Sequence, residues 1–285
     1  MKLENEKFLI EEAVSGNQNA LESLLCGVQD MVFNLSLRML GTVPDAEDAT
    51  QEILIKIMTH LASFRQESSL STWVMRIAIN HLRNSQKGMF SHAALSFETY
   101  GADIVSGKEK DIPDRSAGVE RQLLEQELKY SCTNVMLQCL DAESRCIYIL
   151  GTMFRLNSII AAEILDTTPQ AYRQKLSRIR KKMAQFLNGY CGLSGTGACS
   201  CARRVDYAIE NHRIDPKNLV YNTMKQCNRE DILRCAGAME ELDELSQIFA
   251  GLPAYRSAES TAGWIRKLVA SDHFRTILHP KGETV

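Results

Sequence analysis

The sequence lacks long apolar runs and any segment typical of a signal peptide. Its longest unbroken apolar stretch is Cys146–Leu150, far shorter than the roughly 20 residues that a membrane-spanning helix needs. The first residues, MKLENEKFLIEEA, carry acids where a signal peptide carries only bases, and no long apolar segment follows them. We therefore expect a cytoplasmic protein without a membrane span.

Proline and glycine are also scarce, at 6 and 16 residues, and the alternation of apolar and polar residues typical of strands is rare. Apolar residues recur instead at helical spacing. They make up 45% of the chain and charged residues 24%, which are ordinary values for a globular protein and exclude the fibrous and disordered classes. The sequence predicts an all-α protein of two or three domains.

Helical spacing is interrupted over residues 85–118. Four glycines and one proline punctuate this stretch: Gly88, Gly101, Gly107, Gly118 and Pro113. It is too long for an ordinary connection inside a compact domain, so we predict a flexible linker between helical blocks at 1–84 and 119–190. A third, mainly helical segment at 191–285 follows the glycine-rich turn CGLSGTGAC.

The net charge of -2 is unevenly distributed along the chain. Residues 1–84 carry 7 bases and 11 acids, whereas residues 119–190 carry 10 bases and 7 acids. The overall charge would argue against nucleic-acid binding, but the basic second block is compatible with it.

A helix-turn-helix pattern lies within residues 157–187. Asn157 or Ser158 can cap a helix that ends near Leu165. After a short turn, Thr168 and Pro169 are the residues preferred at the N-cap and first position of a second helix. Two helices joined by a turn of three or four residues are typical of DNA-binding proteins.

The second helix of this pattern has one apolar and one basic face. Tyr172, Leu176, Ile179 and Met183 share a stripe. Six of the ten residues 173–182 are basic and none is acidic. Amides on the opposite face can read base edges while the flanking cations contact phosphates, although an ordinary solvated basic face is the alternative. The candidate DNA contacts are Gln170, Arg173, Gln174, Lys175, Ser177, Arg178 and Lys181.

The first block contains another strongly patterned helix at 44–64, with acidic residues in its first turns, where the helix dipole favours them. Its polar face is either solvated or a docking surface. Next comes the polar loop Glu67–Ser69, and Ser71 and Thr72 are predicted to cap a helix that carries Trp73 and two arginines. A polar loop beside an aromatic ring and arginines can hold an unstacked base, but Trp73 is more simply a core residue.

Together these patterns resemble a known family. The run DAEDATQE, followed by FR, STW and RIAIN within residues 35–84, resembles the conserved second region of bacterial sigma factors of the extracytoplasmic-function (ECF) type. Residues 135–187, which include the closing pattern KLSRIRKKM, resemble the fourth region of the same family. With the intervening linker, the resemblance covers about residues 1–190.

The resemblance implies a role for each matched position. The acidic helix would dock on the clamp of core RNA polymerase through Asp45, Glu47, Asp48, Gln51 and Glu52. The proximal promoter element would be bound and melted by Glu67, Ser68, Ser69, Ser71, Trp73, Arg76, Asn80 and Arg83. The basic helix would read the distal promoter element through the candidates named above. Asp166 stands where the family usually has glycine, and Asp tolerates left-handed backbone geometry better than most residues.

We therefore predict a sigma factor that recruits core RNA polymerase to specific promoter DNA and assists melting. The chain has no phosphate-binding loop of the P-loop type, and we expect no enzymatic activity. The sequence does not decide whether an anti-sigma factor binds it. The alternatives are a polymerase-independent helix-turn-helix repressor or activator and, less favoured, a thiol or zinc enzyme.

The nine cysteines are expected to be mostly reduced, since the chain has no export signal. Cys191, Cys199 and Cys201 are close enough in sequence to bind zinc with a fourth ligand; the candidates for that ligand are Cys227, Cys235 and His212. Their spacing is not that of a standard zinc finger, and free thiols or a redox sensor are the alternatives. No other cofactor is required.

Residues 191–285 form a C-terminal extension beyond the two conserved regions. Helices are predicted near residues 239–252 and 261–274, with Trp264, Leu268 and Phe274 as packing residues. The hypothesis is a helical regulatory module that contacts polymerase, DNA or the other two domains.

Overall fold

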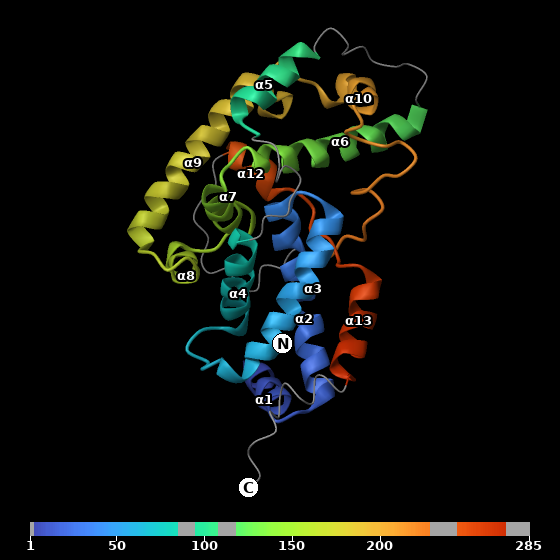
Figure 1. The fold of residues 1–285 in the computed structure, drawn as a ribbon. Helices are drawn as coiled ribbons and strands as arrows, with labels where there is room; N and C mark the ends of the chain where they lie inside the picture. Colours follow the sequence, from blue (N-terminus) through green and yellow to red (C-terminus); the bar gives the residue numbers. More distant parts are fainter. Residues whose placement is uncertain (1–2, 85–94, 108–117, 229–243, 272–285) are drawn as a thin grey trace.

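The computed structural model describes residues 3–84, 95–107, 118–228 and 244–271 (Figure 1). Within these ranges every regular element is a helix, and extended pairing is limited to one isolated bridge between Gln226 and Tyr255. The prediction of an all-α protein is confirmed. None of the helices in these ranges is long and apolar enough to cross a bilayer.

Four helices form the first block: α1 (Leu3–Val14), α2 (Gln18–Leu40), α3 (Val43–His60) and α4 (Leu70–Asn84). The Asn17 side chain caps α2, and Gly41 ends it with a φ of 88°, a left-handed conformation that favours glycine. Thr42 then caps α3 through the backbone N–H of Asp45. The last ten residues of α2 are all buried, so this helix forms the centre of the block.

A helix, α5 (Phe97–Ser106), lies within the stretch predicted to be a linker. Ser96 and Thr99 form a capping box at its start, in which each side chain bonds the backbone N–H of the other residue. The prediction of a flexible linker throughout residues 85–118 is therefore wrong for this part. The flanking residues 85–94 and 108–117 lie outside the described residues.

Aromatic packing holds α5 against α9 (Pro169–Tyr190). The ring centroids of Phe97 and Tyr100 lie 4.9 and 5.7 Å from that of Phe186. A Cβ atom added to Gly101 would lie 2.6 Å from a ring carbon of Tyr190. This glycine is therefore required by close packing rather than by a flexible chain.

The second block consists of α6, α7, the short π-helix η3, α8 and α9. The first four elements span Gly118–Gln138, Ala142–Tyr148, Ile149–Met153 and Ser158–Ile164. The apolar stripe predicted on α9 is buried: Tyr172, Leu176, Ile179 and Met183. Residues of both blocks contribute to the same hydrophobic core.

The C-terminal extension packs on both blocks. Its elements are η4 (Gly192–Ser194), α10 (Cys201–Glu210), α12 (Glu244–Ala250) and α13 (Glu259–Val269). As Figure 1 shows, α10 lies on α6, α12 lies between the two blocks, and α13 runs along α2. Trp264 and Leu268 pack against the core as predicted, whereas Phe274 lies outside the described residues.

Buried polar groups fix the extension to the blocks. Asn34 on α2 donates to the carbonyl oxygen of Tyr255 at 2.6 Å and accepts from its N–H at 2.9 Å. Arg38 on the same helix donates to Asn134 and to the carbonyl of Pro253, both at 2.8 Å. Burial lowers the pKa of the Arg38 guanidinium. Because buried polar groups are costly without partners, these contacts select one placement of the extension.

A buried carboxylate makes a second such junction. Glu127 on α6 accepts hydrogen bonds from the backbone N–H groups of Val220, Tyr221 and Asn222 at 2.6, 3.0 and 3.0 Å. Three successive donors around one carboxylate give charge-assisted hydrogen bonds and fix the turn that leads from α10 back to the first block.

Candidate nucleic-acid interface

The helix-turn-helix forms from local signals in its sequence. Asn157 accepts from the backbone N–H groups of the first turn of α8, and Thr168 caps α9, with Pro169 in its first turn. Between them Asp166 has a φ of 51°. It therefore adopts the left-handed conformation expected at the position where the family usually has glycine.

All seven side chains predicted to contact the distal element are exposed on α9. Two of them also position the helix. Arg173 donates to the Ser158 hydroxyl on α8 at 2.8 Å, and Lys175 Nζ lies 2.6 Å from Glu143 Oε1 on α7. Gln170, Gln174, Ser177, Arg178 and Lys181 have no such tie to another helix among the described contacts, so they are the side chains most available to DNA.

Two of the six basic residues within 173–182, Arg180 and Lys182, point away from the candidate DNA face. Arg180 donates to the carbonyl oxygen of Gly151 at 3.0 Å and to the Thr152 hydroxyl at 3.3 Å, inside the second block. The Lys182 ammonium lies 5.2 Å from the centroid of the Phe97 ring on α5. Fewer basic side chains of α9 are therefore available to DNA than helical spacing alone predicts.

The loop before α4 differs in its cap from the prediction. The Ser69 hydroxyl accepts from the backbone N–H of Thr72 at 3.1 Å, so Ser69 caps α4 and the prediction of Ser71 or Thr72 is wrong. Trp73 is half-buried, and its ring centroid lies 5.1 Å from that of Phe64. Because the ring also packs against the core, Trp73 is at least partly a packing residue.

The proximal-element candidates lie along one exposed strip of the loop and α4. Glu67, Ser69, Asn80 and Arg83 are exposed, and Ser68, Ser71, Trp73 and Arg76 are half-buried. Arg76 differs from the others because its guanidinium contacts the helix-turn-helix. Its Nη2 atom lies 3.0 Å from Glu163 Oε1 and 3.1 Å from the Glu163 carbonyl oxygen on α8. Arg76 thus ties the proximal-element candidates to the first helix of the helix-turn-helix.

The acidic residues of α3 are not equivalent. Asp48 and Glu52 are exposed, with Glu52 Oε2 3.4 Å from His81 Nε2 on α4. The Asp45 carboxylate accepts from the Thr42 hydroxyl at 2.6 Å, which ties it to the N-cap. Glu47 lines a cavity of about 750 Å³ between α2, α3 and the C-terminal extension, and Gln51 is half-buried. The outward acidic surface of α3 thus centres on Asp48 and Glu52.

The comparisons with known proteins converge on one family. Residues 27–87 match the model of sigma-70 region 2. The chain is 26% identical over 183 residues to the ECF RNA polymerase sigma factor SigW of Bacillus subtilis, an alignment that covers 64% of this chain and 96% of that protein. Residues 27–87 thus match sigma-70 region 2, and the chain is similar to ECF RNA polymerase sigma factors.

Other relatives align with this chain over a shorter region. The RNA polymerase sigma-H factor of Pseudomonas aeruginosa is 33% identical over 81 residues, 28% of this chain and 42% of that protein. The ECF RNA polymerase sigma-E factor of Escherichia coli K12 is 35% identical over 79 residues, 28% of this chain and 41% of that protein. The chain thus covers about two fifths of the length of these two relatives.

The geometry of the described residues gives no support to a zinc centre in this chain. Among the described residues, no group of three or more His, Cys, Asp or Glu side chains is arranged to hold a metal ion. Cys191, Cys199 and Cys201, the predicted ligands, therefore do not form a metal-binding set with each other, Cys227 or His212. Cys235 lies outside the described residues. Cys191 is buried at the end of α9, and burial raises its thiol pKa.

Sequence reasoning missed one exposed apolar side chain on the outward face of α3. Ile55 is 38% exposed, one turn beyond Glu52. A single exposed isoleucine is common on protein surfaces, so its interest lies in its place beside Asp48 and Glu52. The i, i+4, i+7 spacing of Asp48, Glu52 and Ile55 could have shown that the three side chains share one face of the helix.

Proposed function

We propose that this sigma factor binds core RNA polymerase, directs it to specific promoters and assists the opening of promoter DNA. Polymerase would bind the outward face of α3, the proximal element would bind the loop and α4, and the distal element would bind α9. No catalytic step is assigned to the chain. Action on promoter DNA places the protein in the cytoplasm.

One observation supports this proposal most strongly. The apolar stripe of α9 is fully packed while all seven predicted distal-element side chains remain exposed on the opposite face. Arg178 and Lys181 supply charge for phosphates, and Gln170 and Gln174 supply amides that can pair with base edges.

DNA binding requires a change at the junction of α4 and α8. Arg76 cannot bind a promoter strand while its Nη2 atom pairs with Glu163. The ion pair is 43% exposed on both sides, so it is worth no more than about 1 kcal/mol. We propose that Arg76 is released from Glu163 when promoter DNA binds, and the ion pair itself adds little to the cost of binding.

The runner-up function, a repressor that binds duplex DNA without polymerase, is not favoured because the relatives named above are RNA polymerase sigma factors. The two functions differ in what the isolated chain does. A repressor protects its operator alone, whereas this protein is expected to protect promoters only together with core polymerase.

Reversal of charge on α3 tests the proposed polymerase surface. The double variant Asp48→Lys with Glu52→Lys should lose co-elution with purified core polymerase in size-exclusion chromatography. Glu11→Lys, at an exposed glutamate on α1 rather than α3, is the matched control and should bind as the unaltered chain does. Equal binding by the double variant and the control would contradict this assignment.

A further inference from the structure

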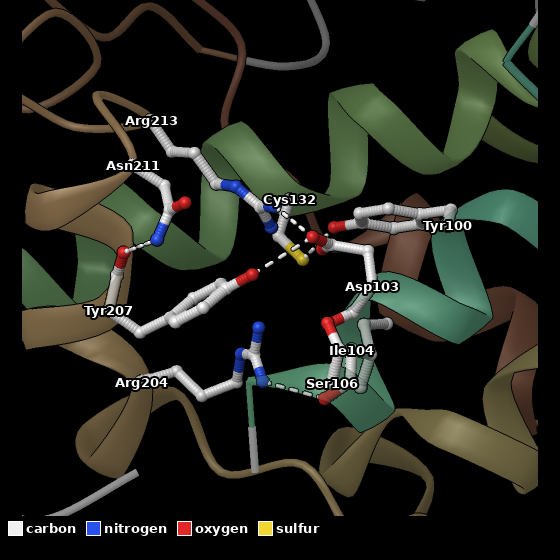
Figure 2. Close-up of polar contacts among 9 residues, drawn as sticks. All are labelled: Tyr100, Asp103, Ile104, Ser106, Cys132, Arg204, Tyr207, Asn211 and Arg213. Carbon is white, nitrogen blue, oxygen red and sulfur yellow. Dashed lines mark hydrogen bonds and ion pairs between the residues drawn. The ribbon is translucent and has the colours of Figure 1, made fainter. Parts of the chain in front are cut away.

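A cavity of about 510 Å³ lies between α5, α6 and α10, away from the polymerase and DNA faces described above. Its volume falls within the range typical of small-molecule sites, roughly 300–1,000 Å³. Figure 2 shows the polar side chains at one end, which come from α5 and from α10 with the turn that follows it. No candidate of the DNA or polymerase surfaces lines this cavity.

Charged groups converge at the polar end of the cavity. Asp103 on α5 accepts from the Tyr207 hydroxyl at 3.0 Å and forms an ion pair with Arg213. Arg204 donates to the carbonyl oxygen of Ile104 at 2.7 Å, and its Cζ atom lies 4.3 Å from the centroid of the Tyr207 ring. The carboxylate is thus paired with Arg213 and also attracts the nearby Arg204 guanidinium, whose described hydrogen bond goes to a carbonyl oxygen.

Arg204 is an incompletely satisfied buried cation. The residue is 5% exposed, and its Nη2 atom has no hydrogen-bond partner among the described residues; the same is true of Asp103 Oδ2. A buried donor without an acceptor costs about 1–3 kcal/mol, and more when it is charged. A negatively charged ligand group that draws Arg204 toward the cavity would recover this cost.

The backbone beside Arg204 is adapted to it. A Cβ atom added to Gly107 would lie 2.8 Å from Arg204 Nη2 and 2.8 Å from ring atoms of Tyr207. Glycine at this position therefore allows α5 to end directly against the cation. The polar end is built by close packing of α5 and α10.

The other walls of the cavity are apolar. Ile104, Leu128 and Val135 line it together with the thiols of Cys132, Cys199 and Cys201, and none of these cysteines forms a disulfide. Burial raises the pKa of Cys201 to about 11 and that of Cys132 well above its usual range. Neutral thiols pack as small apolar groups and are poor nucleophiles, so this geometry does not favour a redox sensor.

We propose that this cavity binds a small organic monoanion, with its acidic head group at Arg204 and an apolar chain or ring against the walls. The lining residues that are charged near neutral pH are Asp103, Arg204 and Arg213, which leaves one positive charge for the ligand to neutralise. Because the site joins α5 to α10, the ligand stabilises the contact of the C-terminal extension with the segment between the two conserved regions.

Two probes test the site on the full chain. The fluorescence of 1-anilinonaphthalene-8-sulfonate, an aromatic monoanion, reports occupancy, and octanoate is the competitor, with octan-1-ol as its neutral match. We expect saturable dye binding that octanoate displaces at least tenfold more effectively than octan-1-ol. No saturable binding of either anion at millimolar concentration, or equal displacement by octan-1-ol, would overturn the proposal.

Variants locate the binding. Arg204→Gln should raise the dissociation constant for octanoate about tenfold, as expected for loss of a charge-assisted contact. Arg203→Gln, the exposed neighbour on α10, is the matched control and should have no effect. Ser131→Trp fills the cavity without removing a charge and should abolish binding while circular dichroism stays unchanged. Unaltered binding to both Arg204→Gln and Ser131→Trp would refute the site.

Discussion

Arg76 Nη2 and Glu163 Oε1 lie 3.0 Å apart although 87 residues separate them in the sequence. The pair joins the helix proposed to melt DNA to the first helix of the helix-turn-helix. In the free protein this contact ties α4 to α8.

Glu163→Arg would place a second cation opposite Arg76 and should loosen the contact between α4 and α8. Hydrogen–deuterium exchange of peptides from these helices should accelerate about twofold or more, because even an exposed pair contributes up to about 1 kcal/mol. The charge-swapped variant Glu163→Arg with Arg76→Glu should restore the exchange rate. Unchanged exchange in Glu163→Arg would show that this pair does not hold the helices together.

Gln174→Ala should reduce discrimination between promoters by about tenfold, since a good amide–base contact is worth roughly 1–3 kcal/mol. Arg178→Ala should instead weaken binding to all sequences and lower the salt slope by about 1. Holoenzyme binding to matched and mismatched promoter fragments separates the two effects. The control is Gln185→Ala, at an exposed glutamine farther along α9. An equal loss of promoter discrimination in this control would contradict the proposed base-reading face of α9.

Asp166→Val should destabilise the protein by about 1–2 kcal/mol, because a φ of 51° is unfavourable for a β-branched residue. Asp166→Gly should leave stability nearly unchanged. The midpoint of urea unfolding, followed by circular dichroism, measures both. A valine variant as stable as the glycine variant would mean that the turn does not need left-handed geometry.

The helix-turn-helix and the first block could be predicted because their signals are local. Thr168 with Pro169, Asn157 and the apolar stripes of α3 and α9 each act within a few residues. The helix α5 was missed because Gly101 and Gly107 suggest flexibility. Only the structure shows that Tyr190 and Arg204 occupy the space a side chain would take.

The contacts across the chain could not be predicted from local patterns. Glu127 accepts hydrogen bonds from residues more than 90 positions away in the sequence, and Arg204 donates one to Ile104, 100 positions away. Helical spacing alone likewise cannot show that the carbonyl oxygen of Gly151 accepts a hydrogen bond from Arg180.

Glu127→Ala should destabilise the protein by about 1–3 kcal/mol, because three backbone N–H groups would lose their charged acceptor. Chemical denaturation measures the loss of stability, and exchange of the amides of residues 220–222 locates it. Glu125→Ala on the same helix is the control. Equal stability of the two variants would show that the carboxylate does not hold this turn.

Run-off transcription with purified core RNA polymerase on a library of genomic fragments tests the central claim most directly. We predict transcripts from a discrete set of promoters when this chain and core polymerase are both present, and none of these when either is omitted. The account would be contradicted if adding the chain left transcription by core polymerase unchanged while the chain alone protected DNA sites.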